Sequence, residues 1–269
     1  MSVYPRRVCV IAAVCLAFCL ATPSAHALVL DWDSNNWASG TLVNSYDLNG
    51  DALSDITVQL TSRQANIWAN DPTTGTQTPV TNQTLTGGLS PVQNSLMLAA
   101  NLKTNSDATV QISFSGGATW TTAANNLSFT LFDIDVTTNS DIIDSIYGLA
   151  PDGSKVAATI TNVGPAVTLT GSGLTYKLTG NAASADNSGN GNATISFASG
   201  VTDIFFTFSN TAGAPRYQDI AIGDISFTPV PEINPAMASA ISCVLAVGLT
   251  VFARRRAKLK ADRSLEAQP

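Results

Sequence analysis

The chain has 269 residues and a formal net charge of −6, from 19 acidic and 13 basic side chains. Residues 28–229 are more acidic than the whole, since they hold sixteen aspartates, no glutamate and five bases, a net charge of −11. This charge argues against nucleic acid as a partner, because binding to phosphates needs clustered Lys and Arg. The composition requires no cofactor, and calcium is a physically sensible counter-ion for so many carboxylates.

The cysteines and the single histidine all lie near the two ends of the chain, at Cys9, Cys15, Cys19, His26 and Cys243. Residues 28–229 therefore contain neither residue type. This excludes disulfide bonds, a Ser-His-Asp or Cys-His catalytic arrangement and a catalytic zinc site from that stretch. Its length suits one domain with its own hydrophobic core. We predict that the protein is not an enzyme.

The first 27 residues have the three parts of a secretory signal peptide. Arg6 and Arg7 form a positive region, and the apolar run 8–20 follows directly. Small residues at 25 and 27 predict cleavage by a signal peptidase before Leu28. The alternative is a retained transmembrane anchor, but this apolar run is short beside the roughly 20 residues that a spanning helix needs.

Short runs of β-branched and aromatic residues, separated by Gly, Asn, Asp and Pro, fill most of the chain between its ends. Alternation of polar and apolar residues predicts strands with one buried and one solvent-facing side. The predicted strands are 56–61, 109–114, 127–135, 144–150, 155–161, 174–178, 193–197, 203–208 and 219–227. The turn sequence at 151–154 predicts a hairpin between its two flanking strands.

This pattern predicts an all-β body at 28–229, built as an antiparallel β-sandwich of the jelly-roll kind. A β-helix is the alternative architecture, but the sequence shows no fixed repeat period. The stretch 91–102 fits a helix or a strand. The segment 181–192 has low complexity and is predicted to be a mobile loop.

An acidic loop at residues 47–55 is the first candidate metal site. Oxygen-bearing side chains stand at Asp47, Asn49, Asp51 and Asp55, a spacing typical of the start of a calcium loop. Val58 occupies the place where a full EF-hand loop carries its bidentate acid, so that motif is excluded. The alternative interpretation is a polar turn that precedes the strand at 56–61.

A second candidate metal site contains Asp133, Asp135 and Asp144, with Asp141 between them. Asp133 and Asp135 are two residues apart, which places them on one face of the predicted strand 127–135. Carboxylates this close repel one another unless a cation or hydrogen-bond donors neutralise them. Calcium at the edge of the sandwich is one hypothesis, and solvated loop carboxylates are the other.

Eight Trp and Tyr residues fit either of two roles in the body. Exposed aromatic rings stack on sugars, whereas buried rings supply much of the core of a sandwich. The residues are Trp32, Trp37, Trp68, Trp120, Tyr46, Tyr147, Tyr176 and Tyr217. Core packing is the expectation for any single one of them.

The C-terminal region predicts a single transmembrane helix. Residues 236–252 carry no charge, and a basic cluster follows at Arg254, Arg255, Arg256, Lys258 and Lys260. By the positive-inside rule the cluster stays in the cytoplasm, so the body is exported. A buried core helix is the alternative, but such a helix does not normally end in five bases at the end of a chain.

Just before this segment lies the tripeptide Val230-Pro231-Glu232. The tripeptide, the short apolar helix and the arginine cluster, at the end of a chain with a signal peptide, together resemble the PEP-CTERM sorting tail. The resemblance covers residues 230–256, followed by a short basic and polar tail at 257–269. Ile233 stands where the family's motif has its second proline. The resemblance implies processing by an exosortase, a transpeptidase-like protein of the membrane.

The resemblance also implies a Gram-negative type of envelope and a role in the extracellular matrix or surface polysaccharide. Our leading hypothesis is an exported, non-enzymatic surface or matrix protein with a membrane-anchored precursor. Its predicted partners are signal peptidase, an exosortase-type protein and, before processing, the inner membrane. The alternative is a carbohydrate-binding β-sandwich module that recognises surface polysaccharide. A third hypothesis, an Asp-dependent glycan hydrolase, needs an aspartate of raised pKa in a cleft.

Overall fold

The computed structural model describes residues 26–115 and 120–231, together with residues 252 and 256. Ala25–Val230 forms one compact unit, and a second unit contains both ends of the chain. The predicted signal peptide and the apolar segment 236–252 fall almost entirely outside the described residues. In the described part of the chain, no helix is long and apolar enough to cross a membrane. In the second unit, the guanidinium of Arg256 lies 5.6 Å from the ring centroid of Phe252, one helical turn away.

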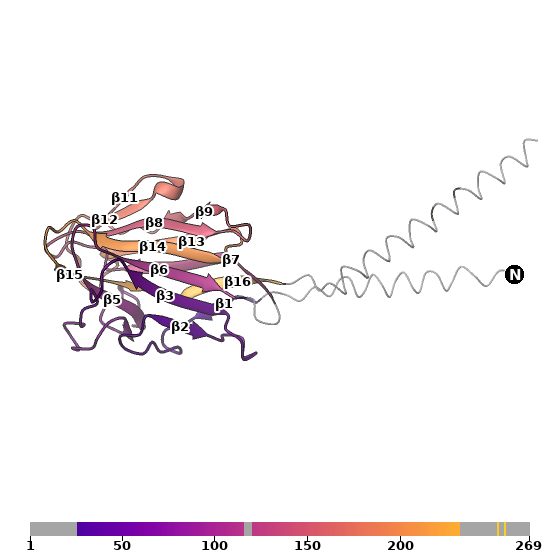
Figure 1. The fold of residues 1–269 in the computed structure, drawn as a ribbon, viewed down its shortest axis with the longest axis horizontal. Helices are drawn as coiled ribbons and strands as arrows, with labels where there is room; N and C mark the ends of the chain where they lie inside the picture. Colours follow the sequence, from indigo (N-terminus) through magenta and orange to yellow (C-terminus); the bar gives the residue numbers. More distant parts are fainter. Residues whose placement is uncertain (1–25, 116–119, 232–251, 253–255, 257–269) are drawn as a thin grey trace, which may run out of the picture. The chain divides into compact units, whose positions relative to one another are not determined.

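The strands of Ala25–Val230 form two antiparallel sheets that pack as a β-sandwich (Figure 1). In sheet A the strand order is β1-β16-β7-β15-β5-β4. In addition, β13 pairs with β7, and β10 pairs with β13. Its strands are β1 (Leu28–Leu30), β4 (Val80–Asn82), β5 (Ser95–Leu102), β7 (Trp120–Phe132), β10 (Thr159–Thr161), β13 (Ala193–Phe197), β15 (Arg216–Ile222) and β16 (Ile225–Pro231).

Sheet B has the strand order β11-β12-β8-β14-β6-β3-β2, and β9 also pairs with β8. Its strands are β2 (Val43–Tyr46), β3 (Ile56–Ser62), β6 (Asp107–Phe114), β8 (Asp141–Leu149), β9 (Lys155–Ala157), β11 (Val167–Thr170), β12 (Lys177–Gly180) and β14 (Asp203–Asn210). Two short 3₁₀ turns, at Gly173–Thr175 and Gly189–Gly191, complete the described secondary structure.

The main core lies between the two sheets and takes side chains from both. Strands β6 and β14 alternate strictly between buried and half-buried residues, as expected for strands with one face on a core. Phe129 of β7 stacks on Phe206 of β14, with ring centroids 6.1 Å apart, and so joins the sheets directly. Trp32 and Trp37 are also fully buried, and these aromatic rings supply much of the core's apolar area.

A second, smaller core covers part of the outer face of sheet A. It contains Met97 and Ala99 from β5, Ala221 from β15, Phe132 from β7, and Leu85 from the long connection between β4 and β5. Strand β5 is therefore buried on both faces along most of its length. The rest of the outer face of sheet A, over β7, β13 and β16, is left for the groove described below.

Several strand predictions are confirmed. The runs at 56–61, 109–114, 193–197 and 203–208 are strands, each equal to or slightly shorter than the element observed. The predicted hairpin is β8–β9, in which Tyr147 pairs with Ala157 and the turn contains Gly153 at φ 81°. The stretch 91–102, which fitted a helix or a strand, ends in strand β5.

The predicted strand 127–135 extends too far. Strand β7 ends at Phe132, and Asp133 has a φ of 64°. The chain leaves the sheet because Ile134 turns into the main core, where its N–H donates to the Gly191 carbonyl at 2.8 Å. Asp133 and Asp135 therefore lie in the loop after β7, so the prediction that they share a strand face is wrong.

Other predicted strands are divided by a change of sheet or of geometry. The run 155–161 splits into β9 and β10, because the first pairs with β8 in sheet B and the second with β13 in sheet A. The run 219–227 splits at Gly223 and Asp224 into the end of β15 and the start of β16. The run 174–178 begins as a 3₁₀ turn and becomes β12 only at Lys177.

Candidate functional site

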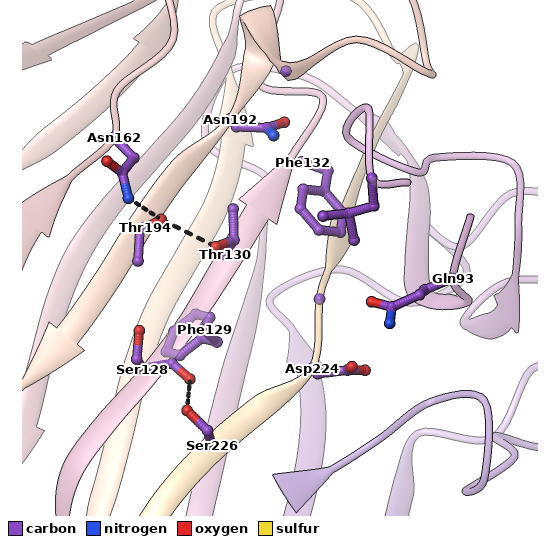
Figure 2. Close-up of a pocket in the computed structure, with 13 residues that line it drawn as sticks. Gln93, Ser128, Phe129, Thr130, Phe132, Asn162, Asn192, Thr194, Asp224 and Ser226 are labelled. Carbon is purple, nitrogen blue, oxygen red and sulfur yellow. Dashed lines mark hydrogen bonds between the residues drawn. The ribbon is translucent and has the colours of Figure 1, made fainter. Parts of the chain in front are cut away.

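A groove of ≈ 470 Å³ lies over the outer face of sheet A (Figure 2). Ser128 and Thr130 of β7, Thr194 of β13 and Ser226 of β16 point into it because alternate residues of a strand face the same side of a sheet. The remaining lining residues come from loops and from side chains beneath the floor: Leu89, Gln93, Phe129, Phe132, Asn162, Gly189, Asn192, Gly223 and Asp224.

Hydroxyl and amide groups form a row along the floor of the groove. The Thr130 and Thr194 hydroxyls are 3.0 Å apart across the paired strands β7 and β13, and Asn162 donates to the Thr194 hydroxyl at 3.4 Å. Figure 2 shows these three side chains in line, with Gln93 and Asp224 on another side of the groove. The floor therefore presents neutral donors and acceptors over two adjacent strands.

Asp224 supplies the carboxylate of the groove. Its carboxylate accepts a hydrogen bond from the Trp32 N–H at 3.0 Å, and the Trp32 indole donates to the Gly223 carbonyl at 3.0 Å. Burial raises the pKa of Asp224, the Trp32 hydrogen bond lowers it, and the nearby charges of Asp31 and Asp33 raise it further. The net pKa lies above the ordinary value.

Two glycines hold the Phe132 ring at one end of the groove. A Cβ on Gly87 would lie 2.3 Å from a Phe132 ring carbon, and one on Gly223 would lie 2.8 Å from another. The Asn192 side chain also donates to the Gly87 carbonyl at 2.8 Å, which joins the segment 181–192 to the connection between β4 and β5. The ring and this contact define the wall of the groove near residue 189.

The acidic loop at 47–55 is held together by its own donors. Asp47 accepts hydrogen bonds from the N–H groups of Gly50, Asp51 and Ala52, and its pKa is lowered because these bonds outweigh the effect of desolvation. Asp55 is fully buried and accepts from Leu48 N–H at 2.7 Å, from Asn49 N–H at 3.0 Å and from the Asn49 side chain at 3.0 Å. The geometry matches the polar turn that precedes β3.

The second predicted metal set is brought together only in part. Asp133 and Asp135 lie near Asp141, whose N–H donates to the Asp135 carbonyl at 3.0 Å. Asp144 points elsewhere, because its carboxylate accepts hydrogen bonds from the hydroxyls of Ser145 and Thr207. It lines a separate cavity of ≈ 300 Å³ on the side of sheet B, so the prediction that it joins Asp133 and Asp135 is wrong.

Sequence reasoning missed Asp219 and Asp186, which lie close to Asp133 and Asp135. Asp219 and Asp186 both raise the pKa of Asp133, which requires that they are near it. The available signal was the polar pair Gln218-Asp219 inside strand β15, whose next three residues are apolar and buried. Among the described residues no group of three or more His, Cys, Asp or Glu side chains stands ready to hold a metal on its own.

Most of the aromatic residues lie in or against the core, as expected. Trp32, Trp37 and Tyr46 are buried there, and Trp68 and Tyr176 pack against it. Tyr147 is different, because it stacks on Phe205 at 5.2 Å between ring centroids and has the Lys155 ammonium 3.9 Å from its own ring centroid. The side chain of Trp120 lies outside the described residues.

No family model and no curated protein match the chain. Two solved structures with some likeness to it are family 11 carbohydrate-binding modules of Clostridium thermocellum. One is in complex with a β-1,3-1,4-mixed-linked tetrasaccharide and has a TM-score of 0.30 at 12% identity. The other is the module of the cellulosomal cellulase Lic26A-Cel5E, with a TM-score of 0.28 at 10% identity. Each comparison covers 78% of this chain and 99% of the module, and at these TM-scores neither carries a functional argument.

Proposed function

We propose that the sandwich is a non-catalytic, polysaccharide-binding body of an exported surface or matrix protein, and that it binds glycan in the groove over β7, β13 and β16. The observation that carries this proposal is the lining of the groove. Four hydroxyls and three amides, with one carboxylate, surround a concave site of ≈ 470 Å³. Ligand sites in proteins are commonly clefts of this size with a few convergent polar groups.

The lining favours a neutral, polyhydroxylated ligand. None of the thirteen lining residues is a base, and the body carries a net charge of −11, so an anionic polysaccharide would be repelled. Hydroxyl and amide groups both donate and accept hydrogen bonds, which matches the hydroxyls of a sugar. The aromatic residues of the lining, Phe129 and Phe132, are only 2% and 3% exposed, so recognition rests on hydrogen bonds rather than on stacking.

The same lining argues for binding rather than hydrolysis. Most glycoside hydrolases place two carboxyl groups on either side of the scissile bond. Asp224 is the single carboxylate among the lining residues, and the Trp32 N–H already donates to it. A purified protein that releases no reducing sugar from any polysaccharide it binds agrees with this proposal, and release that Asp224→Asn abolishes would contradict it.

The groove is tested by titration of the purified full-length protein, kept in mild detergent, against neutral and acidic polysaccharides. Gln93→Ala and Thr194→Val each remove one polar group from the groove. We expect each to weaken binding of a neutral glycan about 3–10-fold, the equivalent of one hydrogen bond. Gln59→Ala and Thr109→Val are the matched controls, because they remove the same groups from β3 and β6 in sheet B.

Two results would contradict the groove as the binding site. One is the absence of binding to any neutral polysaccharide at high protein concentration. The other is equal weakening by the groove variants and by the controls in sheet B, which would place the glycan on another surface. Preference for an acidic polysaccharide would contradict the inferred chemistry of the ligand.

We propose that the sandwich has jelly-roll connectivity.

We further propose that the chain reaches the surface through its two end signals. The Val230-Pro231-Glu232 motif, the apolar segment 236–252 and the cluster Arg254–Arg256 form the sorting tail in this proposal. Signal peptidase removes residues 1–27, and an exosortase-type protein processes the membrane-anchored precursor. Mass spectrometry of the mature C-terminus, in cells with and without the sorting protein, tests this step. An unprocessed C-terminus in both strains would contradict it.

A further inference from the structure

Four aspartates from three segments form a group that we call the carboxylate cluster: Asp133, Asp135, Asp141 and Asp219. Asp133 and Asp135 lie in the loop after β7, Asp141 begins β8, and Asp219 lies within β15. Asp133, Asp135 and Asp141 are 7%, 3% and 3% exposed. Asp219 is half-buried and shares the outer face of sheet A with Tyr217 and Ala221, so the cluster combines three buried carboxylates with one at its edge.

Only some of the cluster's oxygen atoms have donors. Asp135 accepts a hydrogen bond from the Ser184 N–H at 2.7 Å, and one oxygen of Asp141 accepts from the Asp135 N–H at 3.2 Å. Asp219 accepts from the Tyr217 hydroxyl at 3.1 Å. The second oxygen of Asp141 and one oxygen of Asp133 are buried and have no hydrogen-bond partner. Unpaired buried carboxylate oxygens are costly, so these two atoms need an explanation.

Gln218 adds an unpaired oxygen that does not belong to a carboxylate. Its side-chain nitrogen donates to the Thr137 hydroxyl at 3.3 Å and to the Tyr217 carbonyl at 2.8 Å. Thr137 lies in the short loop that joins Asp135 to Asp141, so this contact ties Gln218 to that loop, while Asp219, the next residue of β15, points to the opposite face of sheet A. The carbonyl oxygen of the same carboxamide is buried and has no partner. The residue is 2% exposed, so bulk water does not satisfy it.

The electrostatics of the cluster also indicate that its negative charges lack a compensating positive charge. Burial first, and then the charges of Asp135, Asp219 and Asp186, raise the pKa of Asp133 to about 8. Burial also raises the pKa of Asp141 well above its ordinary value and that of Asp219 to about 6. The charged groups that influence these pKa values are all aspartates, so the cluster's own surroundings supply like charge rather than compensation.

We infer that the carboxylate cluster binds a divalent cation of the calcium type. One cation beside these groups would satisfy the two unpaired buried oxygens of Asp133 and Asp141 and neutralise the like charges together. Among the described residues no group of three or more His, Cys, Asp or Glu side chains is already arranged to hold a metal, so the proposed shell also draws on backbone carbonyl oxygens. Calcium takes six to eight oxygen ligands in flexible geometry and accepts amide and backbone carbonyls, whereas magnesium demands a small octahedral shell.

The test uses the full-length protein in mild detergent, stripped with EGTA and then supplied with CaCl₂ or MgCl₂. We expect calcium at about 100-fold above its dissociation constant to raise the thermal midpoint by about 5 °C or more. Asp133→Asn and Asp219→Asn should each remove at least half of this shift. In EGTA at about pH 9, above the raised pKa values of both groups, both should also raise the midpoint, because each then removes one like charge from the cluster. A merely structural role for these side chains would lower the midpoint instead.

Asp47→Asn is the matched control, since it changes an aspartate of the acidic loop in the same way. It should keep the whole calcium-induced shift. The inference is overturned if neither metal changes the midpoint of the unaltered protein. It is also overturned if the shift survives in both cluster variants but is lost in Asp47→Asn, which would place the cation in the acidic loop. Stabilisation in EGTA by acid, with no response to calcium, would show that protons rather than a cation satisfy the cluster.

Discussion

The acidic loop at 47–55 and the carboxylate cluster contain similar numbers of aspartates, but they differ in the donors around them. In the loop, every carboxylate oxygen of Asp47, Asp51 and Asp55 accepts at least one hydrogen bond, mostly from N–H groups of the loop itself. In the cluster, Asp133 and Asp141 each keep a buried oxygen without a partner. The pKa of Asp47 is accordingly lowered, and that of Asp133 is raised.

The difference shows that a run of acidic residues is a poor guide to where an ion is needed. Residues close in sequence bring their own backbone N–H groups, and a tight turn aims those groups at the carboxylates. Carboxylates that meet through tertiary packing bring no such donors. An oxygen left unpaired by packing is therefore a stronger indication of a cation than the local density of aspartates.

The largest expected effect of a single substitution tests whether the donors of the acidic loop contribute to stability. Asp55→Ala removes a fully buried carboxylate and leaves the N–H groups of Leu48 and Asn49 unpaired. The free energy of unfolding should fall by about 3 kcal/mol, the usual cost of a few buried donors without partners. For a domain of this size the thermal midpoint should fall by about 6–12 °C.

Asp152→Ala is the control for this effect, because Asp152 also accepts two hydrogen bonds, from the N–H and hydroxyl of Ser154, but in an exposed turn. Its midpoint should change by about 2 °C or less, as is usual for exposed sites. Thermal unfolding followed by circular dichroism measures both. Equal losses in the two variants would show that burial does not decide the value of these hydrogen bonds.

The sequence predicted the fold class and most strands because alternation of polar and apolar residues directly reports which face is buried. It also placed the acidic loop correctly, since residues 47–55 form a local turn. It could not find the cluster, because Asp219 is more than seventy residues from Asp141 and joins it only when the two sheets pack. It grouped Asp144 with Asp133 because nothing local shows that Asp144 turns toward Thr207.

The pH dependence of stability should also differ between the two regions. Asp133 and Asp219 have folded pKa values of about 8 and about 6, against about 3.9 in an unfolded chain. At pH values between the unfolded pKa and the folded pKa of each group, the folded state holds more protons than the unfolded state. Stability therefore falls as the pH rises from about 4 to about 8. The lowered pKa of Asp47 acts oppositely, because its contribution is present above about pH 4 and is lost below it.

Thermal midpoints in EGTA, measured from pH 4 to pH 8, should therefore decline toward pH 8. Asp133→Asn should flatten the decline, and calcium at saturation should flatten it in the unaltered protein. Asp47→Asn should leave the slope above pH 5 unchanged. A midpoint that rises from pH 5 to pH 8 in EGTA would contradict the assignment of raised pKa values to the cluster.

The smallest expected effect links the cluster to the groove through the segment 181–192. Asp135 accepts the Ser184 N–H, the Asp186 carbonyl accepts the Thr86 and Gly87 N–H groups, and Asn192 donates back to the Gly87 carbonyl. Gly189 and Asn192 of this segment line the groove, so a cation that fixes the cluster also fixes that wall.

Glycan affinity should then be about fivefold higher with calcium than with EGTA, at the low end of coupling between sites. Titration of a neutral polysaccharide under both conditions measures this coupling. Asp133→Asn should abolish it while Asp47→Asn preserves it, and equal affinities in the unaltered protein would show that the two sites act independently.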